Sequence, residues 1–236
     1  NTAKSLIKKI FEHDANYLQG YLYLGEIALN AGDQESALQY FNQGLEAGYD
    51  SKMIFKYLAD LYKKKQLYHI AYKYYLKVFD ETANTPTFLL DFAEVCMQLD
   101  KIDMCAKILA LPILKTENNQ RIVKLQAELD YRAGKLALEN REYKRALELF
   151  NKSGLKTNAI LFDYAQAYYY LKDYKTAINY YRQTDISKKN INNFIDACLK
   201  NGDLKLATNL TKEYLNADTS IEFANTLFNI AQISIS

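Results

Sequence analysis

Small and apolar residues recur along the chain as one motif with fixed internal spacing, which we call the phrase. Gly25 and Ala37 stand twelve residues apart, and the aromatic Phe41 follows four residues later. The phrase returns at Ala59, Ala71 and Tyr75, at Ala93, Cys105 and Leu109, at Gly134, Ala146 and Phe150, and at Ala165, Ala177 and Tyr181, with a weaker copy at Ile195, Ala207 and Thr211. Apolar residues at i, i+3 and i+4, such as Tyr21 and Leu24, accompany it, which predicts amphipathic helices. Each copy therefore predicts two antiparallel helices, with small residues where the two backbones come closest.

The segments between the paired helices carry helix stop and start signals. Residues 31–33 read Ala-Gly-Asp, residues 171–173 read Leu-Lys-Asp and residues 201–203 read Asn-Gly-Asp. Glycine ends helices in the left-handed conformation, and aspartate caps the first turn of the next helix. One helix pair cannot bury its apolar faces alone, whereas stacked neighbours can. The pattern thus predicts an all-α fold built as a continuous stack of helix pairs.

The repeated phrase resembles the tetratricopeptide repeat (TPR), whose pattern is W-x2-L-G-x2-Y, then A-x3-F, then P. The stretches YLYLGEIALNAGDQESALQYFNQG and FDYAQAYYYLKDYKTAINYYRQT carry the resemblance, which covers nearly the whole chain. Tyr21, Phe55 or Leu161 stands in place of the tryptophan, the closing proline is mostly missing, and the last copy lacks its aromatic residue. The resemblance implies a right-handed solenoid of antiparallel helix pairs.

The spacing of the phrase predicts one array over residues 1–236, with local irregularities. We expect a partial repeat at 1–16, repeats at about 18–51, 52–85, 86–115, 117–157, 158–187 and 188–217, and a terminal helix at 219–235. Pro112 should end or kink a helix, and a long helix should follow within 117–139. A soft bend is expected at 112–126. Since the chain opens in mid-repeat and neither end resembles a polar cap, we expect it to be an excised piece of a longer protein.

Composition and charge narrow the function classes. The net charge of +2 gives no reason to expect nucleic acid as a partner. No apolar stretch is long enough to insert directly into a membrane. Cys96, Cys105 and Cys198 follow no metal or disulfide spacing, so we expect three buried small side chains. This cysteine usage weakly favours the cytoplasm, and an envelope location stays open because the true N-terminus is not seen.

The residues that carry chemistry form no catalytic pattern. His13 and His69 are the two histidines, and no nucleophile elbow, metalloprotease motif or phosphate-binding glycine loop is present. We therefore expect no catalytic site, no metal and no cofactor.

The family's geometry, carried over to this chain, places the first helix of each pair on the concave face. The residues of these helices that packing does not require are then candidate contacts for a partner. They are Leu22, Glu26, Leu29, Lys56, Asp60, Lys63, Leu90, Glu94, Met97, Tyr131, Lys135, Leu138, Phe162, Gln166 and Tyr169, followed by Asn192 and Asp196. The apolar members suggest a partner helix or an extended peptide with apolar anchors. Alternatively, several of them pack between repeats.

Some members of the family bind chaperone C-termini through Lys, Asn and Arg side chains that grip a carboxylate. The corresponding positions here are Leu22, Glu26, Tyr57, Thr87 and Asp91. Two of these are acidic and none is basic, so they should repel a peptide carboxylate. We expect no binding of chaperone tails at this surface.

The resemblance implies a non-catalytic scaffold or adaptor that binds a partner peptide or helix in the concave groove. Two alternatives stay open at this point. One is an assembly or secretion chaperone of a bacterial envelope or motility machine, and the other is the interaction region of a larger enzyme. A fold shared by many functions does not choose among them.

Overall fold

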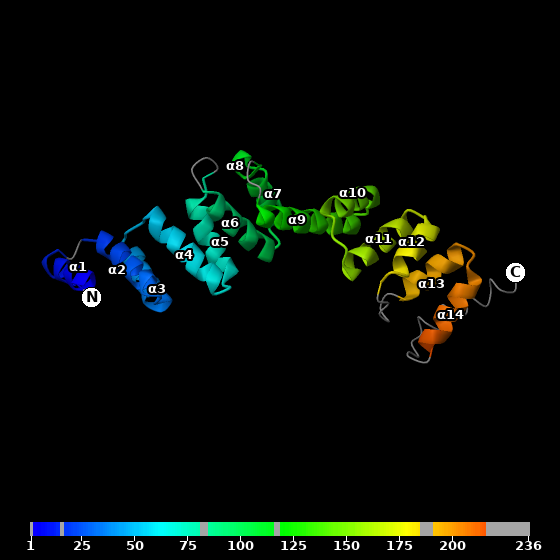
Figure 1. The fold of residues 1–236 in the computed structure, drawn as a ribbon, viewed down its shortest axis with the longest axis horizontal. Helices are drawn as coiled ribbons and strands as arrows, with labels where there is room; N and C mark the ends of the chain where they lie inside the picture. Colours follow the sequence, from blue (N-terminus) through cyan, green and yellow to red (C-terminus); the bar gives the residue numbers. More distant parts are fainter. Residues whose placement is uncertain (1, 15–16, 81–84, 116–118, 185–190, 216–236) are drawn as a thin grey trace. The chain divides into compact units, whose positions relative to one another are not determined.

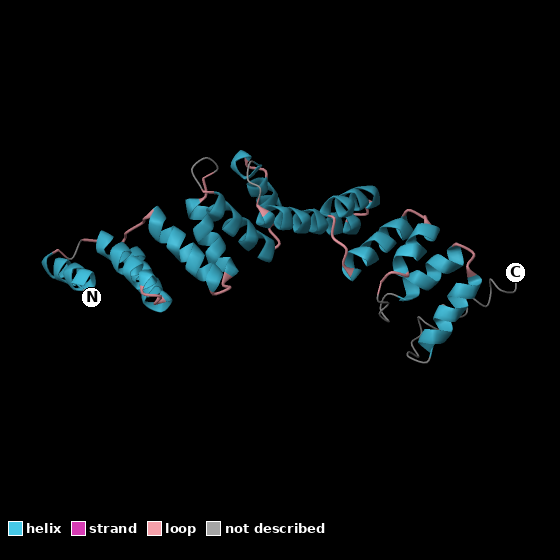
Figure 2. Ribbon diagram, in the orientation of Figure 1, coloured by secondary structure: helices cyan, strands magenta, loops and turns pink. Residues whose placement is uncertain are grey.

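The computed structural model describes residues 2–14, 17–80, 85–115, 119–184 and 191–215, and every regular element within them is a helix (Figure 2). The predicted all-α fold is confirmed. The helices, labelled in Figure 1, are α1 (Thr2–His13), α2 (Gln19–Asn30), α3 (Gln34–Glu46), α4 (Lys52–Lys64), α5 (Tyr68–Val78), α6 (Pro86–Gln98), α7 (Ile102–Leu109), α8 (Pro112–Lys115), α9 (Gln120–Glu139), α10 (Tyr143–Ser153), α11 (Asn158–Tyr170), α12 (Tyr174–Tyr181), α13 (Ile191–Lys200) and α14 (Leu204–Leu215). The terminal helix predicted at 219–235 lies outside the described residues.

Consecutive helices pack against each other as pairs. The pairs α2 with α3, α4 with α5, α6 with α7, α11 with α12 and α13 with α14 are in direct contact, and further contacts join one pair to the next. The chain divides into two units, Asn1–Leu125 and Gln126–Ser236. The long helix α9 begins in the first unit and ends in the second. The bend predicted at 112–126 stays a prediction.

An aromatic ring explains why the first small position of the phrase must be small. A Cβ atom added to Gly25 would lie 2.1 Å from Cε1 of Phe41, and one added to Gly134 would lie 2.6 Å from the ring of Phe150. Both rings are fully buried. The sequence suggested a close approach of two backbones. In the structure the ring of the second helix lies against the glycine of the first, and a Cβ added to Gly134 would also lie 3.3 Å from the backbone carbonyl oxygen of Ala146.

The turns inside the pairs share one backbone conformation. Gly32 and Gly202 have φ of 78° and 79°, and Gln66, Asp100, Arg141 and Lys172 adopt positive φ at the equivalent position. In each turn the residue that follows this position donates its backbone N–H to the carbonyl oxygen five residues earlier, as Asp33 does to Ala28. This bond satisfies a carbonyl group at the end of the first helix. The Asp33 carboxylate then accepts from the Ser36 N–H at 3.0 Å. The predicted stop and start signals are confirmed.

Pro112 explains the break between helices α7 and α8. Helix α7 ends at Leu109, and the four-residue helix α8 begins at Pro112, where the missing N–H costs nothing. After residues 116–118, which are not described, α9 runs for 20 residues. The predicted break and the predicted long helix are both confirmed. No helix in the described part of the chain is long and apolar enough to cross a membrane.

Candidate functional site

The apolar candidates of the first unit lie inside the array. Leu22, Leu90 and Met97 are 8%, 1% and 3% exposed, and Leu29 packs beside the cluster that contains Leu22. Leu22, Leu90 and Met97 are therefore not available as anchors for a partner, as in the alternative that several of these residues pack within the array. The side chain of Leu29 is half-buried.

The charged candidates of the first unit bond to one another. Lys63 on α4 forms ion pairs of 2.5 Å with both Asp91 and Glu94 on α6. Arg121 at the start of α9 approaches the same two carboxylates at 2.7 Å. Two cations and two carboxylates thus join three successive first helices. Arg121 was not predicted, because its partners lie 27 and 30 residues away in the sequence.

The remaining polar candidates of the first unit are also engaged. The Tyr57 hydroxyl donates to Glu26 at 3.0 Å, and the Tyr75 hydroxyl donates to Asp60 at 2.7 Å. Burial raises the pKa of Asp60, and the hydrogen bond from Tyr75 partly opposes that shift. Lys56 lies 5.9 Å from the centre of the Phe88 ring. The first-helix face of this unit therefore uses its polar groups for contacts within the array.

In the second unit, three predicted residues make similar contacts. Tyr131 donates to Asp163 at 3.0 Å, and Tyr169 donates to Asp196. Phe162 packs edge-on against the buried Tyr181, with ring centres 5.8 Å apart. Truncating Phe162 would therefore disturb the core as well as any groove.

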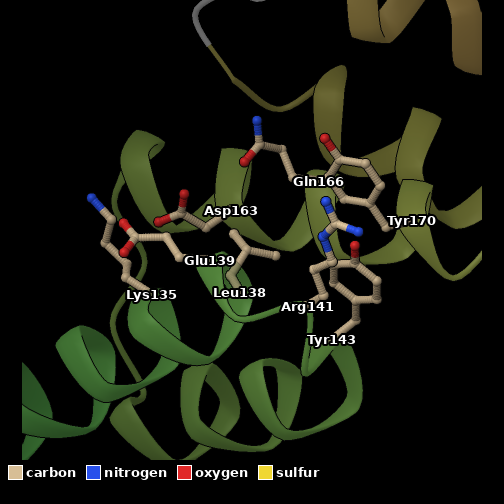
Figure 3. Close-up of a pocket in the computed structure, with 8 residues that line it drawn as sticks. All are labelled: Lys135, Leu138, Glu139, Arg141, Tyr143, Asp163, Gln166 and Tyr170. Atoms are coloured by element: carbon tan, nitrogen blue, oxygen red, sulfur yellow. The ribbon is translucent and has the colours of Figure 1, made fainter.

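Three further predicted residues of this unit line a cleft of about 670 Å³. Its walls come from α9, from the turn that follows it, from the first residue of α10 and from α11 (Figure 3). The lining residues are the predicted Lys135, Leu138 and Gln166, together with Glu139, Arg141, Tyr143, Asp163 and Tyr170. We refer to it as the α9–α11 cleft. Its five additional residues were not predicted, because their convergence depends on how neighbouring helix pairs stack.

An aromatic pair forms one side of the α9–α11 cleft. The rings of Tyr143 and Tyr170 are stacked, with centres 5.0 Å apart and planes at 12°. Tyr170 is nevertheless 50% exposed. Tyrosine presents a rigid apolar face with a polar hydroxyl, which suits contact with another protein.

Asp163 is the buried charge of the cleft. It is 8% exposed, and this burial raises its pKa above the ordinary 3.8. The hydrogen bond from Tyr131 and the charge of Lys135 oppose the shift, whereas the charge of Glu139 adds to it. The second unit should therefore gain stability as the pH falls through the raised pKa, and the gain should be complete below 3.8.

Asp163→Asn should remove this pH dependence. The variant should gain most relative to the wild type at pH values above the raised pKa of Asp163, where the native protein holds a buried charge, and the gain should shrink as the pH falls towards 3.8. Urea denaturation at a series of pH values measures the difference in the free energy of unfolding between the variant and the wild type. Asp60 is also a buried carboxylate with a raised pKa, but it is present in both proteins, so its contribution cancels in this difference. In Glu139→Gln the pH dependence should be weaker, because Glu139 raises the pKa of Asp163. A difference between Asp163→Asn and the wild type that is constant over this range would contradict the assignment.

The groups associated with catalysis offer little reactivity. The three cysteines are buried as predicted, and burial raises the pKa of the Cys96 and Cys198 thiols to about 12. Thiols with such pKa values are poor nucleophiles at neutral pH. Within the described residues, no group of three or more His, Cys, Asp or Glu side chains is placed to hold a metal ion.

The described helices pack as pairs, with a small residue against an aromatic ring and a spacing of 34 residues between the first three copies of the phrase. This is the fold of a TPR-type helical repeat. No family model matches the chain, and no curated protein matches it. Similar solved structures include pilF of Pseudomonas aeruginosa, 16% identical with a TM-score of 0.49, over 90% of this chain and 97% of that one. A TPR protein of Parabacteroides merdae is 14% identical with a TM-score of 0.45, over 99% and 91% of the two chains. YrrB, a TPR protein with an unusual peptide-binding site, is 16% identical with a TM-score of 0.42, over 87% and 97%.

Proposed function

We propose that this chain is a non-catalytic protein–protein interaction scaffold that binds an extended peptide segment of a partner in the α9–α11 cleft. The cleft itself carries the proposal. It is a concave site on the first-helix face, about 670 Å³ in volume, that combines an exposed aromatic surface with charged and amide side chains. Pockets with apolar walls and a few convergent polar groups are the usual form of a binding site.

The contrast with the first unit supports this choice. There, the apolar candidates are buried and the charged candidates pair with one another. In the α9–α11 cleft, Lys135, Glu139 and Arg141 are exposed, and none of them forms an ion pair with another described residue. These three charged groups are therefore available to form ion pairs with a partner.

The shape and chemistry of the cleft favour a peptide in extended form. Gln166 offers an amide donor and an acceptor, which can bond to the backbone groups of an extended chain. Leu138 packs against the core of the unit and supplies an apolar floor. The stacked Tyr143 and Tyr170 can cover a side chain without losing much conformational entropy.

Selection of displayed random peptides on the full chain tests the proposal. Peptides should be enriched, and their affinity should fall about tenfold or more in Tyr170→Ala and Gln166→Ala, because each removes a side chain that lines the cleft. Leu136→Ala and Glu148→Ala are matched controls, since both residues are exposed on α9 and α10 and do not line the cleft. The proposal fails if no peptide is enriched or if all enriched peptides bind the cleft variants as well as the wild type.

A further inference from the structure

The two ends of the α9–α11 cleft differ in charge. The carboxylates of Glu139 and Asp163 lie at one end, with Lys135 beside them (Figure 3). Arg141 lies at the other end with Tyr143 and Tyr170, and Leu138 and Gln166 lie between (Figure 3). A ligand that spans the cleft would therefore meet opposite charges at its two ends.

The carboxylates of the acidic end form no ion pair of the kind that other carboxylates of the described array form. Asp91 and Glu94 share Lys63 and Arg121, Asp130 pairs with Lys152 at 2.9 Å, and Asp196 pairs with Lys200 at 2.7 Å. Among the described residues, no lysine or arginine forms an ion pair with Glu139 or Asp163.

A buried carboxylate without a close cation costs free energy, and Asp163 receives one hydrogen bond, from Tyr131. Glu139, one turn beyond Lys135 on α9, adds a second negative charge that raises the pKa of Asp163. Lys135 acts on Asp163 only as a nearby charge. A cationic side chain of a ligand could therefore approach both carboxylate groups without displacing a lysine or arginine that is ion-paired to them.

The opposite end presents a guanidinium group. Arg141 occupies the turn position with φ of 64°, is exposed, and forms no ion pair with a described residue. A guanidinium group matches a carboxylate with two parallel hydrogen bonds. The hydroxyl groups of Tyr143 and Tyr170 are further donors on the same side of the cleft (Figure 3).

We propose that the ligand of the α9–α11 cleft is an extended peptide with a basic side chain seated against Glu139 and Asp163 and an acidic side chain bound by Arg141. This inference rests on the proposed function and adds the charge and direction of the segment. Gln166, between the two ends, holds the backbone that joins the two charged side chains. Complementary charges of this kind set the orientation of a ligand and exclude wrong ones.

Fluorescence titration of the full chain with short labelled peptides tests the inference. The probes carry a lysine and a glutamate separated by Gly-Ser spacers of increasing length, and each has matched versions with norleucine for lysine or glutamine for glutamate. At one spacer length, the doubly charged peptide should bind about tenfold or more tightly than either neutral version. Its affinity should also fall as salt is raised.

Variants of the chain should move this preference in a predictable direction. Glu139→Gln should lose the discrimination between lysine and norleucine, and Glu139→Lys should disfavour the lysine peptide relative to its neutral version. Arg141→Gln should lose the discrimination between glutamate and glutamine. Glu148→Lys, on the exposed surface of α10, makes the same charge change outside the cleft and should leave both preferences intact. Circular dichroism confirms that each variant is folded.

Any of several results would overturn the inference. The neutral peptides could bind as tightly as the charged one, or the preference could persist in Glu139→Gln and Arg141→Gln. The wild type could also self-associate in a way that Glu139→Lys abolishes, which would identify a second copy of the chain as the occupant. If displayed peptides require Tyr170 and Gln166 but carry no basic residue, the inference fails while the proposed function stands. If no peptide requires the cleft, the proposed function itself fails.

Discussion

Phe92→Ala is expected to lower the free energy of unfolding of the first unit by about 3–5 kcal/mol, the usual cost of removing a buried phenylalanine ring. Phe92 on α6 is fully buried. Its ring centre lies 5.3 Å from that of Tyr75 in a stacked arrangement, 5.5 Å from Phe79 and 5.6 Å from Tyr72. These rings belong to α5 and its C-terminal cap, so the variant leaves a cavity where one helix pair meets the next.

Urea denaturation of the full chain, followed by circular dichroism, measures the loss. Amide hydrogen exchange should assign it to α4, α5 and α6, since the two units need not unfold together. Met53→Ala is the control, because Met53 is exposed at the start of α4 and its truncation should change stability by less than about 1 kcal/mol. A loss below about 1 kcal/mol for Phe92→Ala would show that the ring does not hold these pairs together.

Gly25→Ala is expected to destabilise the first unit by about 1–3 kcal/mol through overpacking. The added Cβ would lie 2.1 Å from Cε1 of the fully buried Phe41, so the ring must move. Alanine favours a helix over glycine by about 1 kcal/mol, and the steric cost should exceed that gain.

A double variant tests whether the clash with Phe41 causes the loss. The third copy of the phrase pairs Ala93 with Leu109, so Gly25→Ala with Phe41→Leu reproduces a combination that the array already contains. The double variant should be more stable than the sum of the two single variants predicts, by about 0.5–3 kcal/mol, because the residues are in contact. Simple additivity, measured by the same denaturation experiment, would contradict this explanation.

The sequence by itself determined the helices, their pairing and their turns. These features depend on local patterns that a single helix pair contains. Gly25 stands twelve residues before Ala37, Asp33 caps the helix that follows it, and Pro112 cannot continue a helix. Each of these signals acts over a few residues or within one pair, so its meaning does not depend on the neighbouring repeats.

The tertiary structure decided which first-helix residues are core and which are surface. Leu22, Leu90 and Met97 lie about one helical turn from the positions equivalent to Lys135 and Gln166, on the same side of their helices, yet they are buried. Their burial depends on the side chains that the adjacent pair presents, and these lie about one repeat away in the sequence. The sequence pattern alone does not fix that contact.

The full set of residues that line the α9–α11 cleft could likewise not be predicted from the sequence pattern alone. Lys135, Leu138 and Gln166 were predicted because they lie on the first-helix face. Arg141 and Tyr143 belong to the turn after α9 and the start of α10, and they reach the cleft only because α11 stacks beside them. Charge pairing between repeats is likewise a property of the stack, since Lys63 and Arg121 neutralise Asp91 and Glu94 from opposite sides in the sequence. Local patterns therefore determined the repeat, whereas contacts between repeats determined where the α9–α11 cleft forms.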